Sequence, residues 1–212
     1  DFYDRCKFAA TIGTLQAGFT DFSYLGEISE KIIRREALIG VSMTGTMENY
    51  EIVINPDIQR KGAEIVKSTN KEIANLIGIN QAARTTCLKP EGTTSCLLGT
   101  SSGIHPHHAK RYLRRVQNNL SETPYQFFKR FNPQATEKSV WSDSGTDENI
   151  LFPIEVVDGA KTKNQLPAID MLKIVQSTQK NWVIPGKNLE LCTKPWLNHN
   201  VSNLSCLSVR KH

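Results

Sequence analysis

Long segments with helical periodicity alternate along this chain with short apolar runs bounded by glycine or proline. The spacing of apolar residues predicts helices over residues 2–20, 56–77 and 166–183. The runs 37–45 and 83–88 are short and mainly apolar or β-branched, as buried strands are. This alternation favours an α/β architecture.

Weaker signals fill the rest of the pattern. Ser29 is a candidate N-cap for a short charged helix that ends near Arg35, and Thr123-Pro124 predicts the start of another helix. Residues 112–116 and 150–157 alternate or cluster as strands do. We find no internal repeat and no low-complexity segment.

Composition narrows the class of protein. The chain has 212 residues, of which 39% are hydrophobic, enough for a folded core. No apolar run approaches the roughly 20 residues that span a bilayer, and the N-terminus lacks the pattern of a signal peptide. The chain also begins without methionine, so we expect it to start inside a longer protein. We expect no membrane partner.

The net charge of +5 suits a phosphorylated ligand and equally an ordinary surface. The basic residues are scattered rather than interleaved with aromatic residues, so we expect no direct nucleic-acid partner. One basic cluster stands out, formed by Lys110, Arg111, Arg114 and Arg115. It either adds to the attraction of phosphate or forms a solvated face, and the solvated face is the better-supported reading.

Five cysteines occur, none in a C-x-x-C pair. The odd count and the spacing argue against a disulfide framework and against a structural zinc site, and favour a reducing cytoplasm. Cys6 and Cys87 fall on predicted elements and are interpreted as buried small side chains. Cys96 follows a predicted turn, where a helix N-terminus can activate a thiol, although packing is the simpler role. His105, His107 and His108 are too tightly spaced around Pro106 for a metal site, so no metal is predicted.

The most informative segment joins a strand, a turn and a helix. The run 83–88 stops at Lys89-Pro90, the turn Glu91-Gly92-Thr93-Thr94-Ser95 follows, and a helix is predicted from about Cys96. Gly92 lets the backbone approach an anion, amides at a helix start lack partners, and the hydroxyls of the turn add donors. The alternative is a capped helix start that binds nothing. No G-x-x-x-x-G-K-[ST] motif occurs, so this is not a P-loop.

Residues 88–106 read LKPEGTTSCLLGTSSGIHP, and this stretch resembles the phosphate-loop region of adenosylcobalamin-dependent (class II) ribonucleotide reductases. Further segments are similar to elements of that family in the same order: 10–16, 35–45, 138–141, 179–183 and 199–203. The resemblance covers nearly the whole chain, and several ordered motifs are far more specific than any one of them.

The resemblance implies part of the C-terminal half of a ten-stranded α/β barrel, within which we assign residues 1–203. It also implies a substrate-phosphate loop at Glu91, Gly92, Thr93, Thr94 and Ser95. In the family, adenosylcobalamin generates a thiyl radical on a cysteine of a finger loop, and two further cysteines reduce the ribose. The implied partners are a ribonucleoside di- or triphosphate and a thioredoxin-type or other dithiol reductant.

Two features depart from the family. The Asn-x-Cys-x-Glu arrangement of the finger loop is absent, so we assign no catalytic residue and expect the chain alone to be inactive. We expect the active-site cysteines before Asp1 and the redox pair after His212. Residues 204–212 form a divergent tail, for which truncation or a frameshift is favoured over an intein junction. The alternatives to the leading interpretation are a di-iron-dependent reductase of the same superfamily and a non-catalytic module that binds nucleotide phosphates.

Overall fold

A computed structural model of the chain describes residues 1–192; the predicted boundary at Asn203 and the tail 204–212 lie outside them. The helices are α1 (Phe2–Ala17), α2 (Glu27–Glu36), α3 (Tyr50–Val53), α4 (Pro56–Ile77), α5 (Gly92–Leu98), α6 (Thr123–Phe131) and α7 (Ala168–Thr178). The strands are β1 (Arg111–Asn119), β2 (Thr136–Lys138) and β3 (Asp147–Glu155). A π-helical turn, Gln179–Val183, continues α7, and short 3₁₀ turns occupy Ser23–Leu25, Pro133–Ala135, Lys163–Gln165 and Leu189–Leu191. Within residues 1–192, no helix is long and apolar enough to cross a membrane.

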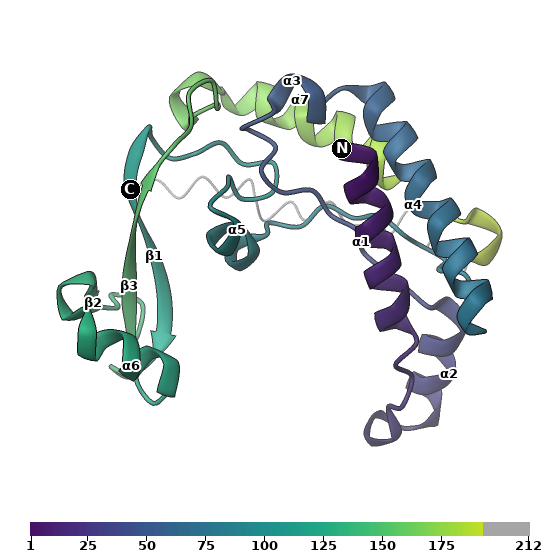
Figure 1. The fold of residues 1–212 in the computed structure, drawn as a ribbon, viewed down its shortest axis with the longest axis horizontal. Helices are drawn as coiled ribbons and strands as arrows, with labels where there is room; N and C mark the ends of the chain where they lie inside the picture. The colour runs from purple at the N-terminus through teal and green to yellow at the C-terminus, as the bar shows by residue number, and fades with distance from the viewer. Residues whose placement is uncertain (193–212) are drawn as a thin grey trace.

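Two groups of elements flank a central region. Figure 1 shows α1, α2 and α4 on one side, the sheet with α6 on the other, α3 and α7 along the top, and α5 between the two sides. Helix α1 packs against α4, and α4 packs against α7 and the turn that follows it. The buried core lies on the helical side and includes Val66, Met171, Ile174 and Trp182, joined by Val41, Leu88 and Ile104 from the central segments.

Local sequence explains the bounds of α4. The Asn55 side chain accepts hydrogen bonds from the amides of Asp57 at 2.9 Å and Ile58 at 3.3 Å, and Pro56 occupies the first turn. The helix ends at Gly78, whose φ of 74° is left-handed and favours glycine. The predicted helix 56–77 is therefore confirmed.

The sheet is antiparallel, in the order β1-β3-β2. Strands β1 and β3 pair over nine residues, with Arg115 opposite Leu151, and β2 pairs with the start of β3. The two long strands confirm the predictions at 112–116 and 150–157 with shifted bounds, whereas β2 was not predicted. Three residues are too few for a sequence pattern to identify a strand.

The predicted strands 37–45 and 83–88 are extended but do not form regular strands. The Val41 amide donates to Thr85 O at 2.9 Å, the Cys87 amide donates to Val41 O at 3.0 Å, and Val41 and Thr86 form an isolated parallel bridge. In the second segment, Arg84 also forms an isolated antiparallel bridge with Lys187. These residues lie side by side as strands do, but their pairing is too short for a continuous ladder.

Two predicted helix starts are corrected. Helix α2 begins at Glu27 after Gly26, whose φ of 81° lets the chain turn, so Ser29 lies inside the helix rather than at its cap. Helix α5 begins at Gly92 rather than near Cys96. Most of the predicted loop 91–95 is therefore the first turn of a helix.

Helix α1 confirms the prediction at 2–20 in type, but apart from Phe2 its large apolar residues do not face the core. Cys6, Ala10 and Thr14 are buried, whereas Ile12 and Phe19 are 59% and 78% exposed. The packing on α4 explains this. A Cβ added at Gly62 of α4 would lie 2.8 Å from the Phe2 ring and 3.3 Å from Cys6 Sγ, so the two helices approach closely through small groups.

Candidate functional site

The turn predicted to bind phosphate starts at a strained residue. Glu91 has φ 55° and ψ 36°, a left-handed conformation that costs energy for a residue with a Cβ. The first hydrogen bond that closes α5 runs from the Ser95 amide to Glu91 O at 2.9 Å. The amides of Gly92, Thr93 and Thr94 precede it and so have no acceptor within the helix. All three residues are exposed.

Ser95 differs from its three neighbours. It is 0% exposed, and its hydroxyl donates to Gly92 O at 3.2 Å while its amide closes the helix. Ser95 therefore stabilises the turn from inside. The Cys96 thiol also donates to Gly92 O, at 3.3 Å, so it serves the same first turn.

The chain entering the turn is held at two points. The Lys89 amide donates to Ser42 Oγ at 3.0 Å, and the Ser102 hydroxyl donates to Pro90 O at 2.5 Å. Gly103 lies directly against this entrance. It has a φ of 57°, and a Cβ added to it would lie 2.5 Å from Lys89 O and 3.2 Å from Pro90 O. The turn is thus carried by the segment 101–103.

A buried polar network in turn holds that segment. Glu48 accepts the Ser101 amide on Oε1 and the Ser101 hydroxyl on Oε2, both at 2.6 Å. His107 Nε2 lies 2.6 Å from Glu48 Oε1, and His107 Nδ1 lies 3.0 Å from the Tyr112 hydroxyl. The side chains of His107 and Glu48 are only 3% and 14% exposed.

The network keeps Glu48 ionised. Burial alone would raise the pKa of this carboxyl, but hydrogen bonds from Ser101 and His107 hold it below its ordinary value. Burial likewise raises the pKa of Tyr112; Arg114 lowers it, and Cys96 and Glu48 raise it. Since Glu48 is a carboxylate, it can only accept, so Nε2 of His107 carries a proton and donates it to Glu48.

Glu48 is the residue that sequence reasoning missed. It lies 59 positions before His107, and nothing in its local pattern marks it. Of the three clustered histidines, His107 pairs with this carboxylate and His105 Nδ1 lies 2.8 Å from Ser102 O, while His108 is exposed. Within residues 1–192, no group of three histidine, cysteine or acidic side chains could hold a metal ion.

Cys6 is buried, as the sequence predicts, whereas Cys87 is only half-buried. Burial raises the pKa of Cys6 and of Cys87 to about 11, which keeps both as unreactive thiols at neutral pH.

Three members of the basic cluster on and beside β1 form ion pairs with acidic side chains. Lys110 pairs with Asp158 at 3.0 Å, Arg111 with Glu155 at 2.7 Å, and Arg115 with Glu137. These exposed pairs favour the solvated-face interpretation.

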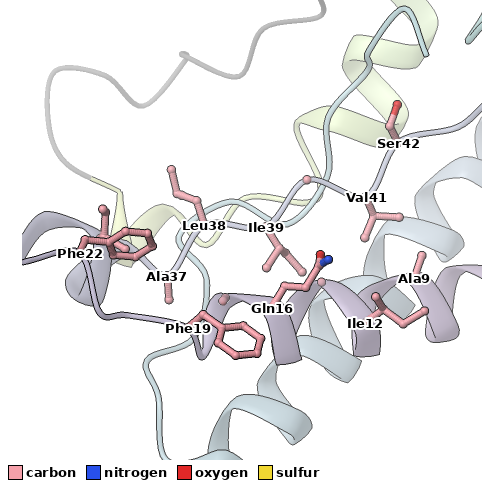
Figure 2. Close-up of a pocket in the computed structure, with 14 residues that line it drawn as sticks. Ala9, Ile12, Gln16, Phe19, Phe22, Ala37, Leu38, Ile39, Val41 and Ser42 are labelled. Carbon is pink, nitrogen blue, oxygen red and sulfur yellow. The ribbon is translucent and has the colours of Figure 1, made fainter. Parts of the chain in front are cut away.

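An apolar groove of about 610 Å³ lies between α1 and the extended segment 37–42. Figure 2 shows the Ile39 side chain pointing toward α1, where Ile12 and Gln16 lie, with Phe19 just beyond the end of the helix and Ser42 at one end of the groove. Ser42 is the residue that accepts the Lys89 amide, so the groove ends at the entrance of the phosphate turn. The groove does not include any residue of the turn itself.

We expect the folded chain to bind an environment-sensitive apolar dye at this groove, because exposed apolar patches attract such dyes. Ile12→Glu should lower dye emission without lowering stability, since Ile12 is 59% exposed. The matched control is Leu97→Glu, at an 88% exposed position outside the groove, which should leave emission unchanged. Equal emission from both variants and the parent chain would contradict the assignment of an exposed apolar groove.

Curated relatives of the chain are reductases of one kind. The adenosylcobalamin-dependent ribonucleoside-triphosphate reductase of Lactobacillus acidophilus is 30% identical over 55% of this chain and 20% of its own length. The enzyme of the same name from Lactobacillus leichmannii is 25% identical over 66% of this chain, and a probable one from Dictyostelium discoideum is 25% identical over 73%. The chain spans about a fifth of the length of these relatives. No protein-family model matches it.

A solved structure shares the fold. The crystal structure of a B12-dependent (class II) ribonucleotide reductase matches with a TM-score of 0.65 and 18% identity, over 86% of this chain and 29% of that one. The expected fold, α/β and part of the reductase barrel, is therefore confirmed. The resemblance inferred from the motifs is confirmed with it: this chain is similar, in sequence and in fold, to a segment of the adenosylcobalamin-dependent ribonucleotide reductases.

Proposed function

We propose that the chain is a segment of a ribonucleoside-triphosphate reductase and that it carries the loop that binds the substrate's phosphates. The observation that carries the proposal is the first turn of α5, where the exposed amides of Gly92, Thr93 and Thr94 have no acceptor within the helix. Amides in this arrangement favour an anion, since the start of a helix carries partial positive charge.

The roles within the turn follow from its geometry. The three amides bind phosphate oxygens, and the hydroxyls of Thr93 and Thr94 add donors. Ser95 supports the turn through its bond to Gly92 O rather than by contacting phosphate. Glu91 contributes its carbonyl, which accepts the Ser95 amide, and its left-handed backbone, which turns the chain into the helix. Binding the phosphate end holds the ribose in register for chemistry elsewhere in the enzyme.

The whole reductase would use adenosylcobalamin, a ribonucleoside triphosphate and a dithiol reductant in the cytoplasm, with thiyl-radical chemistry on cysteines outside this chain. The groove of about 610 Å³ does not fit the cofactor, because its lining is mainly apolar whereas a corrin ring carries many amide side chains that need polar partners. We derive no step through the cofactor from these residues. The names of the relatives favour the cobalamin-dependent enzyme over the di-iron alternative.

A valine at Gly92 tests the loop cleanly. An added Cβ there meets nothing within 4 Å, and Gly92 is not in the left-handed region, so the chain itself tolerates a side chain. In the reductase containing this segment, Gly92→Val should raise the KM for the ribonucleoside triphosphate by more than tenfold, because the side chain occupies the space of the phosphate. Thr94→Ala should weaken binding by about 1.5 kcal/mol, the loss of one hydrogen bond to a charged group.

The control is Leu97→Ala, on the exposed far side of the same helix, which should leave the KM unchanged. Thermal unfolding of each variant checks that the fold is intact. An unchanged KM for Gly92→Val would mean that α5 is only a capped helix start, as the alternative reading holds. A non-catalytic phosphate-binding module would instead bind nucleotides normally in this chain alone and gain no turnover when the rest of the reductase is present.

A further inference from the structure

The buried pair of Glu48 and His107 lies outside the phosphate turn but is connected to it through the chain segment 101–103. We propose that Glu48 and His107 are positioning residues that hold the phosphate turn in its binding conformation, an inference that rests on the proposed function of the turn. Neither residue belongs to the turn, and both act on it through the segment 101–103.

The first step runs from Glu48 to Ser101. Both carboxylate oxygens of Glu48 are engaged by Ser101, one by its amide and one by its hydroxyl, each at 2.6 Å. The Ser101 hydroxyl also accepts the Met47 amide at 3.2 Å. Hydrogen bonds to an ionised acceptor are shorter and stronger than neutral ones, so this two-point attachment leaves Ser101 little freedom.

The second step runs from Ser101 to the turn. Thr44 reinforces the segment, since its hydroxyl donates to Ser101 O at 3.0 Å and accepts the Gly103 amide at 3.1 Å. Ser102 then donates to Pro90 O at 2.5 Å, and Gly103 lies so close to Lys89 O that an added Cβ would be 2.5 Å from it. Displacement of Ser101 therefore moves the residues that precede Glu91 and Gly92.

The third step fixes the direction of the carboxylate. His107 donates from Nε2 to Glu48, and its Nδ1 lies 3.0 Å from the Tyr112 hydroxyl, so both ring nitrogens have a partner. Its backbone is also held, because the His107 amide donates to Lys161 O at 3.2 Å and His107 O accepts the Lys163 amide at 2.7 Å. Tyr112 comes from β1, so the network also ties the segment 101–107 to the sheet.

The cost of burial supports a role beyond packing. The Glu48 side chain is partly buried, at 14% exposed; desolvating a carboxylate is costly, and apolar residues of similar volume usually stabilise a fold at least as well. Fully satisfied polar networks contribute directional contacts that specify one local geometry. At this position, the geometry that they specify is that of the segment supporting the phosphate turn.

The test compares Glu48 variants with Gly92→Val in the reductase containing this segment, measuring KM and kcat for a ribonucleoside triphosphate. Glu48→Ala should raise the KM about tenfold with a smaller change in kcat, since a misplaced turn weakens phosphate binding. Glu48→Gln should recover most of that loss, because its amide oxygen still accepts the Ser101 amide. Tyr112→Phe should raise the KM about threefold, since only the last hydrogen bond of the network is lost.

A second measurement separates positioning from general stability. Amide hydrogen exchange at Gly92–Thr94 should slow on addition of the nucleotide in the parent protein and fail to slow in Glu48→Ala. The matched control is Val66→Ala, a fully buried core position outside the network. It should lower thermal stability yet leave both the KM and the exchange response unchanged.

The outcomes are distinguishable. If Gly92→Val raises the KM and Glu48→Gln, Glu48→Ala and Tyr112→Phe do not, the positioning role is wrong and the proposed function stands. If Gly92→Val also has no effect, the proposed function itself fails. If Glu48→Ala does not fold, Tyr112→Phe decides, since it keeps the contacts between Glu48 and Ser101; an unchanged KM in Tyr112→Phe would then overturn the inference.

Discussion

Trp182→Ala is expected to lower the free energy of unfolding by about 3–5 kcal/mol, the range for removing a large aromatic side chain from a core. Trp182 is 0% exposed, and its ring lies 6.2 Å from that of Phe2, measured between centroids. Its Nε1 donates to Cys87 O at 3.0 Å, so the substitution also removes this hydrogen bond from a partly buried carbonyl. The residue joins the π-helical turn after α7 to α1 and to the central segment 83–88.

Urea unfolding at low protein concentration measures this loss as a shift in the midpoint. Trp182→Phe is the matched variant, since it keeps an aromatic ring but removes the donor, and we expect it to cost about 1–2 kcal/mol. An equal loss in both variants would show that the hydrogen bond to Cys87, rather than the buried volume, dominates. A midpoint unchanged in Trp182→Ala would contradict the packing described for this core.

Gly186→Ala is expected to cost about 3 kcal/mol through overpacking. A Cβ at this position would lie 1.8 Å from Thr86 Oγ1, and Thr86 is only 1% exposed. The Thr86 hydroxyl donates to Trp182 O at 2.7 Å, and Gly186 O accepts both the amide and the hydroxyl of Thr85 at 2.9 Å. Gly186 or Thr86 must therefore move, and several of these buried hydrogen bonds are lost when it does.

The control for this substitution is Gly92→Ala, where an added Cβ meets nothing within 4 Å and stability should change by less than about 0.5 kcal/mol. Combining Gly186→Ala with Thr86→Ala removes the nearest clashing atom. The double variant should therefore lose less stability than the sum of the two single variants. Strict additivity would mean that Gly186 and Thr86 do not contact each other as described.

Helix α4 shows what local sequence patterns can predict. Asn55, Pro56 and Gly78 mark the ends of α4 by capping chemistry that acts within a few residues, and the structure confirms both ends. Helix α5 shows where this reasoning stops. A start at Gly92 requires Glu91 to be left-handed, a conformation that is unfavourable for a residue with a side chain and that the sequence does not predict. The two residues before Glu91, Lys89 and Pro90, contact residues 101–103, which are remote in sequence.

Local sequence also does not determine which face of a helix is buried. The apolar stripe of α1 predicted a helix correctly, but Gly62 on α4 allows close approach of Phe2, Cys6 and their neighbours, and so Ile12 and Phe19 face the groove. Periodicity identifies which residues share a face, whereas the partner's surface decides which face is buried.

The order of helices and extended segments, and the turn at 91–95 that is predicted to bind phosphate, follow from residues close together in the chain, where capping, turn chemistry and periodicity operate. The resemblance to class II reductases rests on several sequence motifs that occur in that family's order. The Glu48–His107 pair required the fold, because its partners are 59 positions apart and are joined only when the segments 42–48, 101–107 and 161–163 meet. Buried hydrogen bonds depend on distances of about 3 Å between atoms remote in sequence, and no local pattern encodes such distances.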